Sequence, residues 1–193
     1  MKNSERAART RANLVLAAAR HFDRHGYDGT TLNPVCAEAG VTLGALTFHF
    51  GCKAALASAV VDEGVGELQR VSTAYSGTGR PLYGLSVLVL QVATALQNNV
   101  LTRAAARLVE EGYVDCGWFG AFRGDVLHLL ERASATGDLV ADVRPATAAR
   151  LIMYLVEGAA TEARSAEAEG VSMASDFAEV WHAVLGGLAA DTR

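Results

Sequence analysis

Apolar residues recur every three or four positions along this chain, and this spacing constrains the fold more than any other feature. Such a period places apolar side chains on one face of an α-helix, whereas the alternation typical of β-strands is rare here. Alanine and leucine, both strong helix formers, dominate. The prolines, Pro34, Pro81 and Pro145, stand near expected helix starts, where a missing N–H is tolerated. The sequence therefore predicts an all-α protein of about nine helices.

Glycines and polar loops divide the expected helices. Gly26 ends the first helix, Gly40 follows the second, and Thr31 and Thr42 are N-caps of the second and third. The expected helices span about residues 4–25, 31–39, 42–49, 52–75, 81–98, 101–112, 117–136, 145–169 and 172–190.

Composition suits a compact soluble protein of one or two small domains, because 51% of the 193 residues are hydrophobic and 20% are charged. No secretory signal and no apolar run of about 20 residues is visible, so we expect a cytoplasmic location. The cysteines, Cys36, Cys52 and Cys116, form no CxxC pair. We therefore expect neither a disulfide nor a metal site.

Charge is distributed unevenly, although the net charge is −4. Residues 1–56 hold seven basic and four acidic residues, and the remainder holds ten basic and seventeen acidic residues. A basic head on an acidic body is typical of DNA contact confined to one end of a protein.

Residues 35–42 have the pattern of a helix-turn-helix, two short helices joined by a tight turn. Ala37 is small enough to let the two helices approach, and Gly40 can take the positive φ that the turn requires. Val41 points back into the core, and Thr42 caps the next helix, whose first residues would meet a major groove. An ordinary helical hairpin is the alternative for this pattern alone.

A longer pattern around this turn resembles the N-terminal signature of the TetR family of transcriptional regulators. It reads Phe22-x3-Gly26-Tyr27-x2-Thr30-Thr31-Leu32, then Ala37-x2-Gly40-Val41-Thr42-x-Gly44-Ala45-Leu46-x-Phe48-His49-Phe50-x2-Lys53-x2-Leu56.

The resemblance implies a helix-turn-helix domain over residues 1–52 and a ligand-binding and dimerisation domain over residues 53–193. It implies a homodimer on a pseudo-palindromic DNA operator, released when a small hydrophobic effector fills the second domain. Phe48 and Phe50 are expected to lock the third helix onto the first and fourth. The expected DNA-binding residues are Arg9, Arg11, Thr31, Thr42, Leu43, Gly44, Ala45, Thr47, His49 and Lys53.

The C-terminal part resembles the γ-butyrolactone-receptor branch of this family, found in antibiotic-producing actinomycetes. The resemblance rests on Pro81-Leu82-x2-Leu85, on Arg107-Leu108-x-Glu110 and on Trp118, and it implies a lactone-like effector with Trp118 on the pocket wall. For the apolar and aromatic residues of this set, the alternative is that they simply pack in the core. For Glu157, the alternative is that it simply lies at the surface. The expected ligand-binding residues are Leu85, Leu88, Val89, Val92, Trp118, Phe119, Phe122 and Glu157.

The last two helices are expected to form the dimer interface, because two such helices from each subunit make a four-helix bundle. The expected interface residues are Ile152, Tyr154, Leu155, Trp181, Val184 and Leu185.

No pattern typical of catalysis or cofactor binding is present, so we expect neither an enzyme nor a cofactor. His21 and His25 stand four residues apart on the first helix, but no third ligand is evident nearby. Packing is therefore the preferred interpretation of both.

Four departures from the family fall at the expected DNA surface. Leu43 stands where a polar residue is usual, and Thr47 replaces a tyrosine that typically holds a phosphate. Gly51 and Cys52 replace a Pro-Ser entrance to the fourth helix, and Pro34 removes an N–H that the Thr31 cap would otherwise satisfy. Two hypotheses follow: a working repressor with an altered operator preference, or a ligand-binding protein with weakened DNA affinity that acts as a signal sink or heterodimer partner.

The double change Leu43→Lys with Thr47→Tyr separates these hypotheses. It adds one cation and one longer hydroxyl-bearing side chain per subunit, so we expect tighter operator binding by at least about 1 kcal/mol and a steeper salt dependence. A salt titration of operator binding measures both effects. Tight wild-type binding in high salt, weakened by the double change, would identify Leu43 and Thr47 as readers of an unusual operator.

Overall fold

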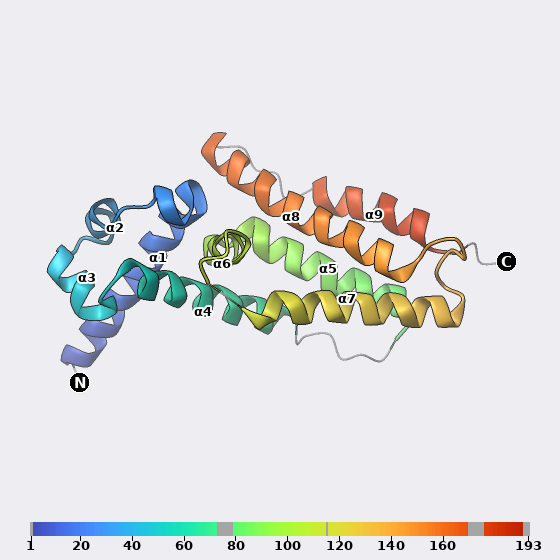
Figure 1. Cartoon of the computed structure of the whole chain (residues 1–193), viewed down its shortest axis with the longest axis horizontal. Helices are drawn as coiled ribbons and strands as arrows, with labels where there is room; N and C mark the ends of the chain where they lie inside the picture. Colours follow the sequence, from blue (N-terminus) through green and yellow to red (C-terminus); the bar gives the residue numbers. More distant parts are fainter. Residues whose placement is uncertain (1, 73–78, 115, 170–175, 191–193) are drawn as a thin grey trace. The chain divides into compact units, whose positions relative to one another are not determined.

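The computed structural model describes residues 2–72, 79–114, 116–169 and 176–190. Within these ranges the chain forms nine α-helices and no strand longer than an isolated bridge (Figure 1). They are α1 (Lys2–Gly29), α2 (Leu32–Ala39), α3 (Leu43–Phe50), α4 (Lys53–Ser72), α5 (Pro81–Asn98), α6 (Val100–Glu110), α7 (Gly117–Thr136), α8 (Pro145–Glu169) and α9 (Asp176–Leu188).

The all-α expectation is confirmed, and the bounds of α5, α7 and α8 agree with the expected ranges. The expected end of the fourth helix at residue 75 and the expected start of the ninth at residue 172 lie outside the described residues. The expected break of the first helix at Gly26 is confirmed. Gly26 has φ 69° and ψ −177°, which are not helical values, and one further turn beyond this kink carries the bounds of α1 to Gly29.

This extra turn at the end of α1 has a local cause. The buried Thr30 hydroxyl donates a 2.7 Å hydrogen bond to the Gly26 carbonyl, and the Thr30 N–H donates to the Tyr27 carbonyl at 3.2 Å. These two bonds close the turn that follows the glycine.

The chain divides into two compact units, and each unit is made of two segments that are separate in the sequence. The first contains residues 1–67 and 99–116, and the second contains residues 68–98 and 117–193. This division differs from the expected one at residue 52, because α6 and most of α4 belong with α1, α2 and α3. Long-range helix packing decides the boundary, and sequence order alone does not reveal it.

The first unit is built around α1, which packs against both α2 and α6. Its core consists of aliphatic and aromatic side chains from every helix of the unit, including the fully buried Leu14, Phe22, Val35, Leu46 and Leu56. Burial of these side chains holds the short α2 and α3, which at eight residues each are too short to be stable alone.

The second unit is a helical bundle in which α5 packs against α7, α8 and α9 (Figure 1). Leu85, Val89, Val126, Leu130 and Ile152 fill its interior. Backbone hydrogen bonds fasten the end of α9 to the segment before α8: Val140 N–H donates to the Leu188 carbonyl at 3.0 Å, and Ala190 N–H donates to the Asp138 carbonyl at 2.9 Å.

Among the described residues, no single helix has both the length and the apolar character of a membrane span. Two bent pairs, α3 with α4 and α5 with α6, reach that length and composition only when their helices are counted together.

The crossing of α4 and α6 within the first unit depends on Gly64. A Cβ atom at this position would lie 2.3 Å from the Leu101 carbonyl oxygen and 2.6 Å from the Ala105 Cβ. These neighbours are backbone and a helix-fixed methyl group, so they cannot move aside without shifting α6.

Gly64→Ala should therefore destabilise the protein by about 1–3 kcal/mol through overpacking. Gly66→Ala is the matched control, because no atom lies within 4 Å of a Cβ there and alanine is the better helix former by up to about 1 kcal/mol. Urea unfolding followed by circular dichroism measures both. Equal effects of the two substitutions would contradict the close crossing.

Candidate functional site

The turn between α2 and α3 has the backbone geometry that its sequence predicts. Gly40 adopts the left-handed conformation (φ 67°, ψ 33°), with Gly40 N–H donating to the Ala37 carbonyl and Val41 N–H donating to the Cys36 carbonyl. This pair of bonds is a Schellman motif, which needs glycine at its left-handed position. Thr42 then caps α3, since its hydroxyl oxygen accepts from the Ala45 N–H at 3.2 Å.

Thr31 stands at the expected N-cap position, and the loss of its capping bond that Pro34 predicts is confirmed. Thr31 occupies the N-cap position of α2, but its side chain makes no capping hydrogen bond. The third residue of α2 is Pro34, which has no N–H for the threonine hydroxyl to accept. The exposed Thr31 hydroxyl is therefore not used by its own helix.

The outer face of α3 is apolar and exposed. Leu43 is 47% exposed and Phe48 is 84% exposed, whereas Leu46 and Phe50 are buried. The expectation that Phe48 locks α3 onto its neighbours is wrong: Phe48 and Phe50 stand about 200° apart around a helix, so only one of them can face the core. The helical period from Leu46 to Phe50 contains this information, which makes Phe48 the surface residue that the sequence analysis missed.

Thr47 belongs to the same exposed face. Its hydroxyl donates a 2.6 Å hydrogen bond to the Leu43 carbonyl, one turn earlier in α3. A DNA phosphate would have to displace this bond to receive the same proton. The departures from the family at Leu43 and Thr47 therefore leave α3 with few polar groups directed outward.

Some of the basic side chains expected to contact DNA are exposed, and others already contact a carboxylate or an aromatic ring. Arg9 is exposed on α1, while Arg11 lies 3.7 Å from Glu63 and places its guanidinium 5.2 Å from the centre of the Phe50 ring. Lys53, at the start of α4, has its ammonium 4.3 Å from the centre of the Tyr27 ring. His49 lies half-buried beside the Phe50 ring.

The two histidines of α1 make different contacts. His21 Nε2 lies 3.1 Å from Glu38, which also accepts from Arg20 at 2.8 Å, so these residues join α1 to α2. His25 is exposed, with its ring centre 5.9 Å from that of His21. Among the described residues, no group of three metal-binding side chains comes together.

A buried ion pair joins α1 to α6 within the first unit. Arg103 Nε donates to Asp23 at 2.9 Å, and both side chains are at most 5% exposed. Arg107 donates to the Asp23 carbonyl at 2.6 Å and to Glu111 at 2.8 Å. Arg103, Arg107 and Glu111 stand four residues apart, so they share one side of α6 and its C-terminal end.

Glu111 extends this network to the kink in α1. Its second carboxylate oxygen accepts a 2.8 Å hydrogen bond from the Tyr27 N–H. A Cβ on Gly26 would lie only 2.4 Å from Glu111, so the glycine provides both the positive φ of the kink and the space for the carboxylate.

Tyr113 adds an aromatic contact at the same place. Its ring stacks on Tyr27 with 4.1 Å between centres, and its hydroxyl donates to Asp28. This hydrogen bond, followed by burial and neighbouring negative charge, raises the pKa of Tyr113 above its usual value. The phenol therefore remains a protonated donor at neutral pH. Elsewhere in the unit, burial raises the pKa of the Cys36 thiol, which makes it less reactive.

Except for Glu157, the residues expected to bind an effector are buried or half-buried in the second unit. Leu85, Leu88, Val89, Val92 and Phe122 are buried there, and Trp118 and Phe119 are half-buried. The Trp118 ring stacks on Phe122, with 5.4 Å between ring centres and 4° between planes.

Two polar atoms of this unit are buried without a hydrogen-bond partner among the described residues, namely Gln91 Oε1 and Trp181 Nε1. They belong to α5 and α9, which contact each other. An unsatisfied buried donor or acceptor costs about 1–3 kcal/mol, so these atoms are candidates for contact with a ligand.

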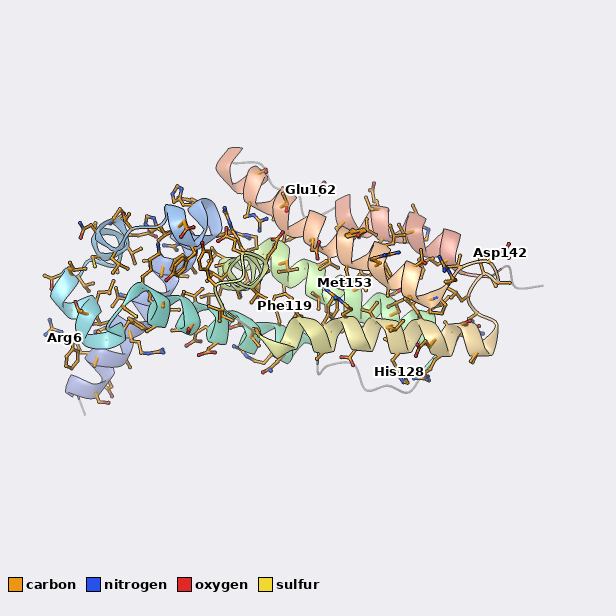
Figure 2. All side chains as sticks on the ribbon, viewed as in Figure 1. Arg6, Phe119, His128, Asp142, Met153 and Glu162 are labelled. Atoms are coloured by element: carbon orange, nitrogen blue, oxygen red, sulfur yellow. The ribbon has the colours of Figure 1, made fainter. Side chains whose placement is uncertain are left out.

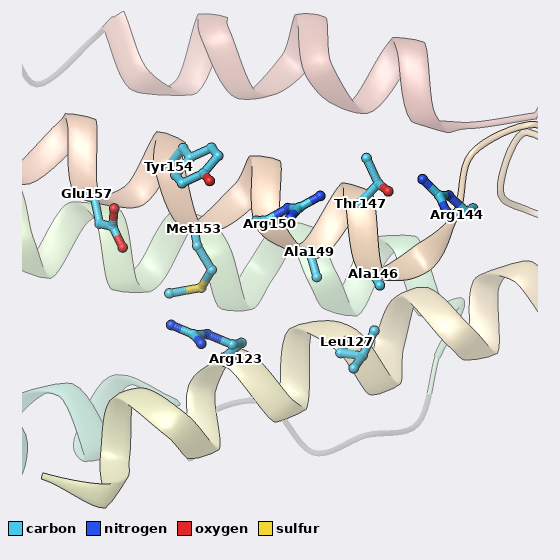
Figure 3. Close-up of a pocket in the computed structure, with 10 residues that line it drawn as sticks. All are labelled: Arg123, Leu127, Arg144, Ala146, Thr147, Ala149, Arg150, Met153, Tyr154 and Glu157. Atoms are coloured by element: carbon cyan, nitrogen blue, oxygen red, sulfur yellow. The ribbon is translucent and has the colours of Figure 1, made fainter.

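A cavity of about 560 Å³ lies between α7 and α8, where Met153 of α8 points toward α7 (Figures 2 and 3). Of the residues expected to bind ligand, only Glu157 lines it. The lining residues are Arg123, Leu127, Arg144, Ala146, Thr147, Ala149, Arg150, Met153, Tyr154 and Glu157.

The expected dimer interface needs a correction. Ile152 and Trp181 are buried inside their own unit (0% and 2% exposed), so they cannot form the outer face of α8 and α9. The helical period directs Ile152 inward and its neighbour Leu151 outward. Tyr154 is 62% exposed. The remaining expected residues, Leu155, Val184 and Leu185, are half-buried.

A capped helix-turn-helix that presents α3 to solvent, followed by a helical bundle, defines a DNA-binding regulator of the two-part bacterial type. The family model described as "Bacterial regulatory proteins, tetR family" matches residues 14–60. The A-factor receptor protein of Streptomyces griseus is 32% identical over 98% of this chain and 67% of its own length. The chain belongs to the TetR family and is a transcriptional regulator, which confirms the expected resemblance.

Solved structures extend the similarity over nearly the whole chain. A γ-butyrolactone receptor described as ArpA-like is 30% identical with a TM-score of 0.81, over 96% of this chain and 90% of that one. CprB from Streptomyces coelicolor, in complex with its biological operator sequence, is 30% identical with a TM-score of 0.76, over 97% and 92% of the two chains.

Arg103→Met should lower the free energy of unfolding by about 3–5 kcal/mol, because it removes the guanidinium that pairs with the buried Asp23 carboxylate. Arg20→Met is the control, because it breaks the ion pair between Arg20 and Glu38, which is similar in length but more exposed to solvent. Such a surface ion pair contributes about 1 kcal/mol or less to stability. Urea denaturation compares the two. Similar losses in both variants would show that burial does not govern the α1–α6 pair.

Proposed function

We propose that this protein is a ligand-responsive repressor that binds a pseudo-palindromic operator as a dimer and releases it when a small hydrophobic effector binds. The observation that carries the proposal is the outer face of α3, where Leu43 and Phe48 are exposed although apolar. Large apolar side chains exposed on a capped helix-turn-helix suit a contact surface. We further propose that the protein acts in the cytoplasm and without catalysis.

The DNA contacts that we propose are of two kinds. Leu43 and Phe48 make apolar contacts at the base edges, for which the thymine methyl group is the available partner in the major groove. Phosphate contacts position the protein, and they come from side chains around α3 and on α1. We assign them to Thr31, Thr42, Thr47, His49, Lys53, Arg9 and Arg11, with Gly44 and Ala45 allowing close approach.

The dimer that we propose uses the outward faces of α8 and α9. Leu151, Tyr154 and Val180 are exposed although large and apolar, which is unusual for a monomer surface. The half-buried Leu155, Val184 and Leu185 would complete the contact. A two-fold axis between α8 and α9 of two subunits matches the symmetry of a pseudo-palindromic operator.

The effector that we propose is a γ-butyrolactone-like molecule, by analogy with the relatives described above. It would enter the interior between Trp118 and α5, where the packed apolar side chains would separate to admit it. The Trp181 N–H can donate to a lactone carbonyl, and Gln91 Oε1 can accept from a hydroxyl. Such contacts would satisfy the two buried polar atoms that lack partners among the described residues.

The test is fluorescence anisotropy with labelled DNA that flanks the gene for this protein. We expect specific binding with a dissociation constant on the order of 10⁻⁸ M and a strong salt dependence. Adding a panel of γ-butyrolactones should release the DNA. Binding of a lactone without any operator affinity would instead support the signal-sink hypothesis.

Phe48→Ala should weaken operator binding about tenfold, by removing one buried aromatic contact of roughly 1–2 kcal/mol, while thermal stability stays unchanged. Phe50→Ala is the contrasting variant, since Phe50 is buried and its loss should cost about 3–5 kcal/mol of stability. Binding to nonspecific DNA, which depends on phosphate contacts, should change little with Phe48→Ala. Unchanged operator affinity in this variant would exclude Phe48 from the interface.

A further inference from the structure

The cavity between α7 and α8 gathers three arginines on its wall. Arg123 comes from α7, Arg144 from the residue that precedes α8, and Arg150 from the second turn of α8 (Figure 3). All three side chains are exposed to solvent at the cavity. A ligand that enters the cavity from solvent would therefore meet their guanidinium groups without any rearrangement of the bundle.

None of these three guanidinium groups has an ion-pair or hydrogen-bond partner within the part of the chain that the structure describes. Four arginines of the first unit, Arg11, Arg20, Arg103 and Arg107, each contact a carboxylate. An anion bound beside these groups would supply the charge-assisted hydrogen bonds that they lack within the described residues.

Composition does not explain this cluster. Residues 68–98 and 117–193 contain eight basic and eleven acidic residues, so the second unit is acidic as a whole. A cavity with three arginines and one carboxylate, Glu157, is a local reversal of that charge. Local positive charge in an acidic unit attracts anions selectively to this place.

The remaining walls define the rest of the ligand. Leu127, Met153 and the two alanines of the lining are apolar, and Tyr154 adds an aromatic ring. Glu157 lies at the opposite end of the cavity from Arg144, which disfavours a second negative charge at that end (Figure 3). The volume of about 560 Å³ is within the range of sites for small organic molecules.

We propose that this cavity binds a small amphipathic carboxylate, with its anionic head between the arginines and its apolar body against Leu127 and Met153. The planar guanidinium fork matches a carboxylate with two parallel hydrogen bonds. The site is separate from the interior that we propose for a neutral lactone, and it goes beyond the proposed repressor function. The protein would then respond to two chemically different ligands.

The test is isothermal titration calorimetry of the full-length protein with decanoate, below its micelle concentration. Methyl decanoate, which has the same body without the charge, is the matched neutral probe. We expect one decanoate per chain, weakened by salt, and no measurable binding of the ester. Arg144→Gln with Arg150→Gln should weaken decanoate binding about tenfold or more, because two charge-assisted hydrogen bonds are lost.

Two further variants sharpen the result. Arg132→Gln removes an arginine from α7 that does not line the cavity, and it should leave decanoate binding unchanged. Glu157→Gln removes the opposing negative charge and should tighten binding several-fold. Equal binding of decanoate and its methyl ester, or unchanged decanoate binding in the double arginine variant, would overturn the proposal.

The competing explanation is that acidic side chains of a second copy of this chain neutralise the arginines, since Tyr154 lies both on the cavity and on the proposed dimer face. Analytical ultracentrifugation of the double arginine variant decides this. The proposal is overturned if the double variant forms a weaker dimer and the wild-type protein does not bind decanoate. A dimer in the double variant that is as stable as that of the wild type supports the proposal. Operator binding and lactone release should persist in this variant, so failure here is distinguishable from failure of the proposed repressor function.

Discussion

The ion pair between Asp23 and Arg103 is the interaction on which the first compact unit depends. It brings α6, from the middle of the chain, against the end of α1, in a place where neither charge can be solvated. An unpaired charge at this depth costs several kcal/mol, so α1 and α6 gain stability only in the register that joins the two side chains. Arg107 and Glu111 extend the same side of α6 to the kink at Gly26.

This arrangement supports α3 from the core side and leaves its outer face exposed. Leu46 and Phe50 anchor α3 in the core, and the Schellman turn at Gly40 sets the angle at which α3 leaves α2. Leu43, Thr47 and Phe48 then remain at the surface. Because the Thr47 hydroxyl already donates to the Leu43 carbonyl, the exposed face of α3 is mainly apolar.

The second unit combines two kinds of unsatisfied chemistry in separate places. In its interior, Gln91 and Trp181 present one acceptor and one donor in an otherwise apolar core, which suits a neutral ligand with few polar groups. At the α7–α8 cavity, the guanidinium groups of Arg123, Arg144 and Arg150 have no partner among the described residues, and they suit an anion instead. Moving a charged ligand into an apolar core costs far more free energy than leaving its charge at a solvent-exposed cavity. The interior therefore suits a neutral ligand and the cavity suits a charged one.

Sequence by itself determined the helical class, the Gly40 turn, the Thr42 cap and the family, because these depend on residues close together in the chain. It also placed α5, α7 and α8 correctly, since their apolar period and flanking glycines or prolines are local signals. Tertiary structure decided what depends on distant partners: the pairing of Asp23 with Arg103, the membership of α6 in the first unit, the inward positions of Ile152 and Trp181, and the meeting of three arginines at one cavity. No local pattern encodes these, because burial and charge pairing arise only when helices from distant parts of the chain pack together.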